Sequence, residues 1–107
     1  MNSSDSVHAE LAAAEAARAA GNEGRARVCA RRAAGLAARD FWERRQGGRR
    51  GDSAYDLLRQ LAELPGLDPE LRQAARHLTL RVSEAFRLPD DVDLIADARI
   101  LCARLGE

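Results

Sequence analysis

An alanine-rich segment from Leu11 to Arg39 constrains the fold of this chain more than any other feature. It predicts two helices joined by a turn at Gly21-Asn22-Glu23-Gly24, because alanine favours helix and glycine interrupts it. Larger apolar side chains in the segment are few, namely Leu11, Val28, Cys29 and Leu36. With so little apolar surface, this hairpin cannot be stable alone and must pack against the leucine-rich second half of the chain or another subunit.

The two helices of this hairpin have recognisable limits. The first begins after Ser4, Asp5 or Ser6, any of which can cap a helix, and ends near Ala20. The second runs from near Glu23 to about Arg45, with alanines recurring at three- and four-residue spacing on one face. A glycine-rich segment at about 46–52 then predicts a mobile loop.

Capping signals predict three further helices. Ser53 with an acid three residues later resembles a capping box, and Pro65-Gly66 ends this short third helix. Asp68-Pro69-Glu70 starts a fourth helix, whose apolar face continues to Phe86 before Pro89 stops it. For the fifth helix, the predicted cap is Asp90 or Asp91, and the predicted end is Gly106.

No stretch alternates between apolar and polar residues with period two, so no strand is expected. The five helical signals have mostly short connections, and the chain of 107 residues has the length of one domain. The sequence therefore predicts a single all-α domain over residues 1–107, an antiparallel up-and-down bundle of about five helices.

Charge is balanced overall but unevenly distributed. Seventeen acids match seventeen basic residues, all arginine, a pattern typical of biased composition. Residues 1–24 have a net charge of −3, residues 25–50 of +7 and residues 51–107 of −4. The basic second helix either faces acidic neighbours inside the bundle or across a dimer, or binds phosphate; the first reading is favoured because aromatic platforms for single strands do not accompany the arginines.

The cysteines and the hydropathy pattern exclude several classes of protein. Cys29 and Cys102 lie far apart, with no CxxC pattern and no histidine cluster, so we expect reduced thiols, no metal site and no cofactor. No apolar run approaches the roughly 18 residues of a membrane span. A cytoplasmic location without membrane association is therefore expected.

The hairpin is open to two family readings. Gly21, Ala26 and Ala33 have spacings compatible with one tetratricopeptide unit, although no second copy of that 34-residue period follows. Across nearly all its helices the chain more closely resembles the HEPN domain family, a group of small helical bundles. The similarity lies in four segments: residues 13–34 with their glycine turn, Ser53-Ala54-Tyr55-Asp56-Leu57-Leu58, Ala85-Phe86-Arg87-Leu88-Pro89-Asp90, and residues 95–101.

Some members of the HEPN family are ribonucleases that use an arginine followed, after four to six residues, by a histidine. Arg72 and His77 have this spacing here. In such a mechanism the histidine would transfer a proton and the arginine would stabilise the phosphate charge. On a helix the two side chains point about 140° apart, so they could converge only in a groove formed with another helix or subunit.

A cluster of aromatic and basic residues at the end of the second helix is the predicted partner-binding surface. It consists of Phe41, Trp42, Arg44 and Arg45. The aromatics either close the end of the bundle or form an exposed anchor, since aromatic and arginine side chains are favoured at interface hot spots.

Three functions remain open at this point. The HEPN resemblance implies a non-catalytic interaction module, expected to be a homodimer, that could work with a nucleotidyltransferase-type partner or in a toxin–antitoxin type system. The alternatives are a metal-independent ribonuclease that uses Arg72 and His77, with RNA as its partner, and a tetratricopeptide-like scaffold for protein interactions.

Overall fold

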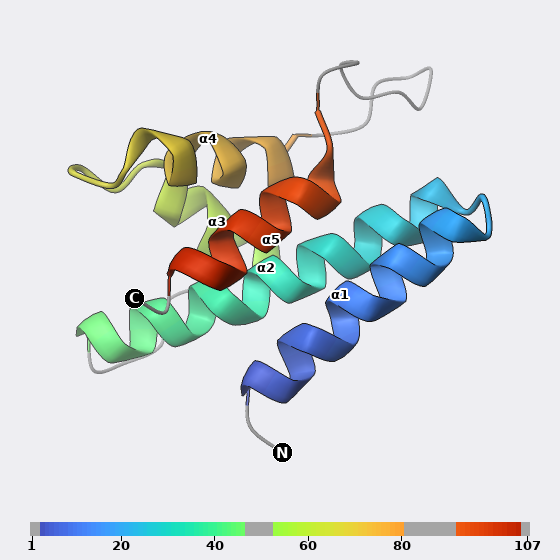
Figure 1. Cartoon of the computed structure of the whole chain (residues 1–107). Coiled ribbons are helices and arrows are strands. Elements are labelled where there is room, and N and C mark those ends of the chain that lie inside the picture. Colours follow the sequence, from blue (N-terminus) through green and yellow to red (C-terminus); the bar gives the residue numbers. More distant parts are fainter. Residues whose placement is uncertain (1–2, 47–52, 81–91, 106–107) are drawn as a thin grey trace.

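The computed structural model describes residues 3–46, 53–80 and 92–105, and these ranges contain five helices and no strand (Figure 1). The helices are α1 (Ser3–Ala19), α2 (Glu23–Gln46), α3 (Ala54–Ala62), α4 (Pro69–Leu78) and α5 (Leu94–Arg104). The predicted all-α bundle is confirmed. Apart from Gln46, the last residue of α2, the predicted loop at 46–52 lies outside the described residues. No helix in these ranges has both the length and the apolar character needed to cross a membrane.

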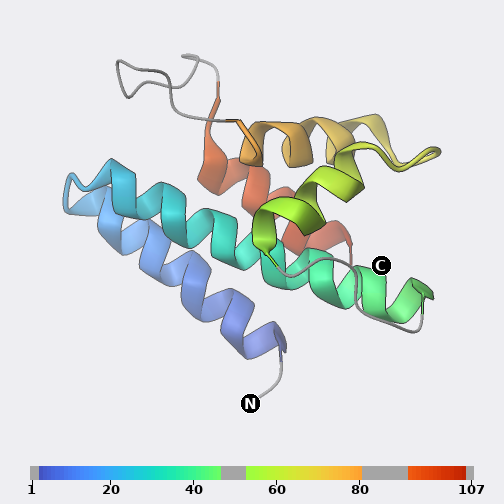
Figure 2. The ribbon, with the colours of Figure 1, turned by 180° about the vertical axis from the view of Figure 1, so that it is seen from behind.

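The long helix α2 lies at the centre of the bundle. It packs against α1, α3 and α5, whereas α4 packs against α3 and α5 (Figures 1 and 2). The buried side of α2 consists mainly of small side chains: Ala26, Cys29, Ala30, Ala33, Ala34, Ala37 and Ala38. The large, fully buried leucines come from the other half of the chain: Leu57, Leu58, Leu61, Leu78, Leu94 and Leu101. The second half of the same chain therefore covers the alanine hairpin, one of the two arrangements that the sequence left open.

Gly35 is a point of close approach between α2 and α3. A Cβ atom added at Gly35 would lie 3.0 Å from the Cα of Ala54 and closer still to its Cβ, nearer than real Cβ atoms approach one another. Because Ala54 is the first residue of α3, this contact lets α3 begin directly against the α2 backbone. Ser53 caps the helix at that point by accepting a hydrogen bond from the backbone N–H of Asp56, as the capping box predicts.

The fourth helix is shorter than the sequence predicts. It ends at Leu78, so the prediction of one helix continuing to Pro89 is wrong. Two interactions stop the helix: the Thr79 hydroxyl donates to the Arg76 carbonyl, and the Arg31 guanidinium of α2 donates to the carbonyls of Leu78 and Leu80 at 3.0 and 3.1 Å. These bonds satisfy carbonyls that otherwise lack partners at a helix end.

The cap of the fifth helix is Asp93, so the expectation of Asp90 or Asp91 is wrong; those two residues lie outside the described ranges. The Asp93 carboxylate accepts hydrogen bonds from the backbone N–H groups of Ile95 and Ala96. It also pairs with Arg18 of α1 at 3.0 Å. This distant arginine adds a second contact to Asp93, which a sequence with several nearby acids does not reveal.

Replacing Gly35 with alanine should destabilise the protein. The added methyl group meets Ala54, so α3 must shift, and overpacking of this kind costs about 1–3 kcal/mol. Gly24→Ala in the same helix is the control, since its added Cβ comes no closer than 3.9 Å to another atom and should leave stability unchanged or raise it by at most about 1 kcal/mol. Urea denaturation measures both free energies of unfolding. Equal stabilities for the two variants would contradict the close contact.

Candidate functional site

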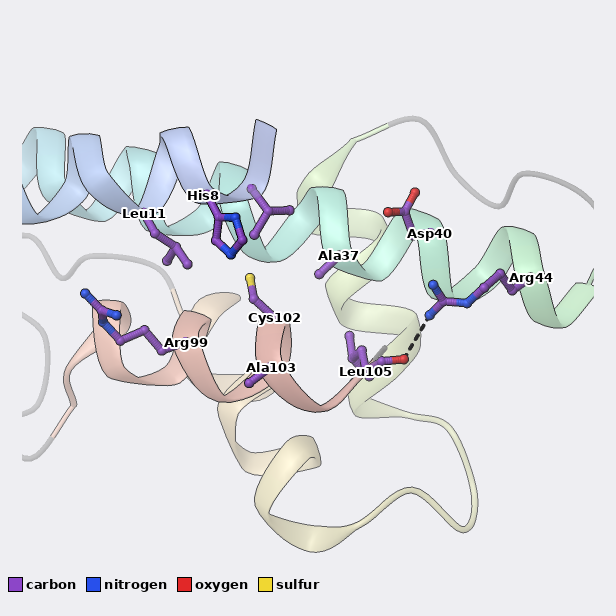
Figure 3. Close-up of a pocket in the computed structure, with 10 residues that line it drawn as sticks. His8, Leu11, Ala37, Asp40, Arg44, Arg99, Cys102, Ala103 and Leu105 are labelled. Carbon is purple, nitrogen blue, oxygen red and sulfur yellow. Dashed lines mark hydrogen bonds between the residues drawn. The ribbon is translucent and has the colours of Figure 1, made fainter. Parts of the chain in front are cut away.

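A hollow lies between α1 and α5, with α2 beneath it (Figure 3). Its volume is about 410 Å³. The floor is apolar, formed by Val7 and Leu11 of α1, Ala37 of α2 and Leu105 at the end of α5, each 5–9% exposed. We call this hollow the α1/α5 groove.

The rim of the α1/α5 groove carries charges of both signs. Arg99 of α5 lies toward one end, where its guanidinium pairs with Glu15 at 3.3 Å, and Asp40 and Arg44 of α2 lie toward the other (Figure 3). The Arg44 guanidinium donates to the backbone carbonyl of Leu105 at 2.9 Å, the dashed line in Figure 3. The groove therefore has an apolar floor, His8 near its middle, a positive group at one end and groups of both signs at the other (Figure 3).

Cys102 lies in the same groove, but its environment does not favour nucleophilic chemistry. Its thiol donates to the Ala33 carbonyl at 3.6 Å, and burial raises the pKa of Cys102 to about 11. A thiol with this pKa is almost entirely protonated at neutral pH, and the thiolate is the reactive form. Cys29 is completely buried, and both thiols are free.

The residues predicted to be catalytic both line a shallow depression of about 400 Å³ on α4. The full lining is Pro69, Arg72, Gln73, Arg76 and His77. Nδ1 of His77 lies 2.9 Å from a carboxylate oxygen of Asp97 on α5. The structure thus places Arg72 and His77 on one depression, with a carboxylate holding the histidine ring.

Arg72 also has a structural task. Its guanidinium donates to the carbonyls of Leu64 and Leu67, at 3.1 and 3.4 Å, in the segment between α3 and α4. The Nε of Arg72 is buried and has no hydrogen-bond partner among the residues that the structure describes. Arg72 therefore holds the α3–α4 connection whether or not it also contacts a ligand.

Asp97 of α5 does not line the depression but contacts His77, and sequence reasoning missed it. Burial raises the pKa of its carboxyl group, while the hydrogen bond from His77 acts in the opposite direction. The two residues are twenty positions apart and lie on different helices, so no local spacing links them. Only the packing of α4 against α5 brings the carboxylate to the ring.

The predicted partner-binding cluster is divided between the core and the surface. Trp42 is only 3% exposed and its indole N–H donates to the Leu57 carbonyl at 3.3 Å, so Trp42 closes the end of the bundle, one of the two readings that the sequence left open. Phe41 is half-buried and packs edge-on against Trp42, with 5.2 Å between ring centroids. The Arg45 guanidinium lies 5.6 Å from the centre of the Phe41 ring. Phe41, Arg44 and Arg45 remain available for the predicted role, which stays a prediction.

Comparisons with known proteins do not supply a family. No family model, curated protein or solved structure matches the chain. Within the described ranges, no three histidine, cysteine or acidic side chains gather in a way that could hold a metal ion. The function must therefore be argued from the surfaces of the bundle.

The raised pKa of Cys102 predicts slow alkylation. At pH 8 the thiolate fraction should be roughly a hundredfold lower in the folded protein than in the unfolded chain, and it should increase as the pH approaches about 11. Iodoacetamide labelling followed by peptide mass spectrometry measures this rate in native buffer and in urea. Cys29 provides an internal control, because its complete burial should prevent labelling of the native protein at pH 8 and at higher pH. Equal rates for Cys102 in the two buffers would contradict the prediction.

Proposed function

We propose that this protein is a cytoplasmic helical interaction module that acts as a homodimer, with the α1/α5 groove as the contact between the two copies. The observation that carries the proposal is the combination of an apolar floor with a rim of both charge signs. A two-fold dimer brings the same patch of each subunit together, so the patch must be complementary to itself. A rim of one sign would repel its copy, whereas this rim can pair with it.

The arrangement of the rim supports a two-fold axis through the groove. Asp40 and Arg99 lie toward opposite ends (Figure 3). Rotation by 180° about an axis between them would bring Asp40 of one copy toward Arg99 of the other, twice in each dimer. The apolar floor would be covered in the same step.

The resemblance to the HEPN family supports the broader role. It favours a module that works beside a nucleotidyltransferase or in a toxin–antitoxin type system. A tetratricopeptide-like scaffold fits less well, because such a hairpin stacks on equivalent hairpins, whereas α2 is covered here by two unlike helices, α3 and α5.

Blocking the groove should weaken dimer formation. Ala103 is exposed and lines the groove, so Ala103→Trp places a large ring at its opening without replacing a core residue. We expect the dissociation constant of the dimer to increase at least about tenfold, as measured by light scattering over a concentration series. Ala16→Trp, on the exposed face of α1 and outside the groove, should leave dimerisation unchanged. A monomeric wild-type protein at high concentration, or equal effects of the two variants, would refute the proposed dimer.

A second candidate function is metal-independent cleavage of RNA. The observation that favours it is the depression on α4, where Arg72, Arg76 and His77 could surround a phosphate while Asp97 holds the His77 ring. A histidine oriented by a carboxylate can serve as a general acid or base near neutral pH. The structural bonds of Arg72 to Leu64 and Leu67 make this candidate weaker than the interaction module.

If RNA cleavage is the function, His77→Ala should remove it and Asp97→Asn should reduce it by about ten- to a hundredfold through loss of ring orientation. A fluorogenic single-stranded RNA in the presence of EDTA measures the rate. Arg59→Gln, an exposed arginine on α3 outside the depression, is the control for loss of a positive charge. Absence of cleavage by the wild-type protein, or equal cleavage by the His77 variant, would eliminate this candidate.

A further inference from the structure

A second surface, on the outer face of α2, has a different character from the groove. Arg25, Arg32 and Arg39 follow one another at seven-residue intervals, with Val28 and Leu36 between them. We call these five residues the arginine stripe. Arg25 and Arg32 are exposed, Arg39 and Leu36 are partly buried, and Val28 is 43% exposed, the most exposed large apolar residue described.

The helical geometry keeps the stripe on one side of α2. Seven residues make nearly two turns, so the three arginines drift by only about 20° per step and follow one another at intervals of about 10.5 Å along the axis. Near its middle the stripe borders a depression of about 210 Å³ between α1 and α3. Six residues line it: Glu10, Arg32, Gly35, Leu36, Arg39 and Ala54. In Figure 2, α3 begins over the middle of α2 and leaves the half nearer the α1–α2 turn uncovered by α3.

The charge of the stripe has one sign. Glu10 is the only acid that lines the depression, and the side chains of Arg25 and Arg32 have no hydrogen bond or ion pair with any described residue. Other arginines of α2 do act within the bundle: Arg31 closes the end of α4 and Arg44 bonds the end of α5. Arg25 and Arg32 are therefore outward cations that the described fold does not use.

We infer that the arginine stripe binds an acidic amphipathic helix of another protein. Acids at a seven-residue interval on such a helix would face Arg25 and Arg32, and an apolar side chain between them would cover Val28. A second copy of this chain does not fit, because two identical basic stripes repel each other. Nucleic acid fits less well, because an exposed valine has no role against phosphate and the stripe offers no aromatic ring for base stacking.

This surface is separate from the proposed dimer contact. The stripe shares no residue with the α1/α5 groove. Loss of dimerisation would therefore leave the inference intact, and loss of peptide binding would leave the dimer intact. Charge complementarity between this surface and its partner should act mainly on the association rate and on the choice of partner.

The probe is a fluorescent 21-residue helical peptide with glutamate at every seventh position and leucine between the glutamates. A scrambled peptide of the same composition, and a single-stranded RNA labelled with the same dye, are the comparisons. Fluorescence anisotropy with the full-length protein should show binding of the designed peptide that is at least tenfold tighter than binding of the scrambled peptide. Raising the salt concentration from 50 to 500 mM should weaken that binding, because exposed charges are screened.

Charge reversal then locates the site. The double variant Arg25→Glu/Arg32→Glu should weaken peptide binding by at least about tenfold, while Arg59→Glu on α3 should change it less than twofold. The milder double variant Arg25→Gln/Arg32→Gln, with an unchanged circular dichroism spectrum, shows that a loss is not caused by unfolding. The inference is overturned if the designed peptide does not bind, if the scrambled peptide binds equally well, if RNA binds more tightly, or if the Arg59 variant loses as much affinity as the stripe variants.

Discussion

The close packing of small side chains on α2 is the constraint on which the rest of the bundle depends. Three helices share this one helix as a neighbour, and the alanines along its buried side let their backbones approach. At Gly35 even a methyl group is too large, because Ala54 of α3 occupies its place. The leucines of the other four helices can therefore pack into a single core against α2, whose own buried side chains are mostly small.

The arginines close the ends of the helices. Arg31, Arg44 and Arg72 each donate to backbone carbonyls at or beyond the end of a helix, at α4, α5 and α3 respectively. Burial lowers the pKa of Arg31, in keeping with a guanidinium drawn into the bundle to reach those carbonyls. Biased composition explains why the basic residues are all arginine, but it does not explain this use of them. A guanidinium reaches two carbonyls at once because its donors are held in a rigid fork.

The bundle has two surfaces along α2 that differ in the signs of their charges. The α1/α5 groove has both signs on its rim, as the proposed dimer requires, whereas the arginines of the stripe have one sign, as the inferred acidic partner requires. Both lie along α2, so one helix could link self-association to the binding of a second protein. A module with these two surfaces would bring two copies of an acidic partner together.

The sequence by itself determined the features that depend on neighbours along the chain. Ser53 and Asp68 cap α3 and α4 as predicted, because a cap is a bond to a backbone N–H two or three residues away. The number of helices and their all-α packing follow from the same local signals. The sequence left open whether Phe41 and Trp42 close the end of the bundle or form an exposed anchor, and only the packing shows that Trp42 is buried and Phe41 half-buried.

The tertiary structure alone decided what depends on residues far apart in the chain. Arg31 ends α4 from 47 positions away, Arg18 contacts the cap of α5 from 75 positions away, and Asp97 reaches His77 from another helix. Each of these contacts requires two particular helices to lie close together. Many other arginines and acids have similar spacings in the sequence, so the sequence did not show which of them would form a contact. The pattern of alanine and leucine specifies that the helices pack. The volumes of the side chains between them determine how the helices lie against one another, and therefore which charged groups meet.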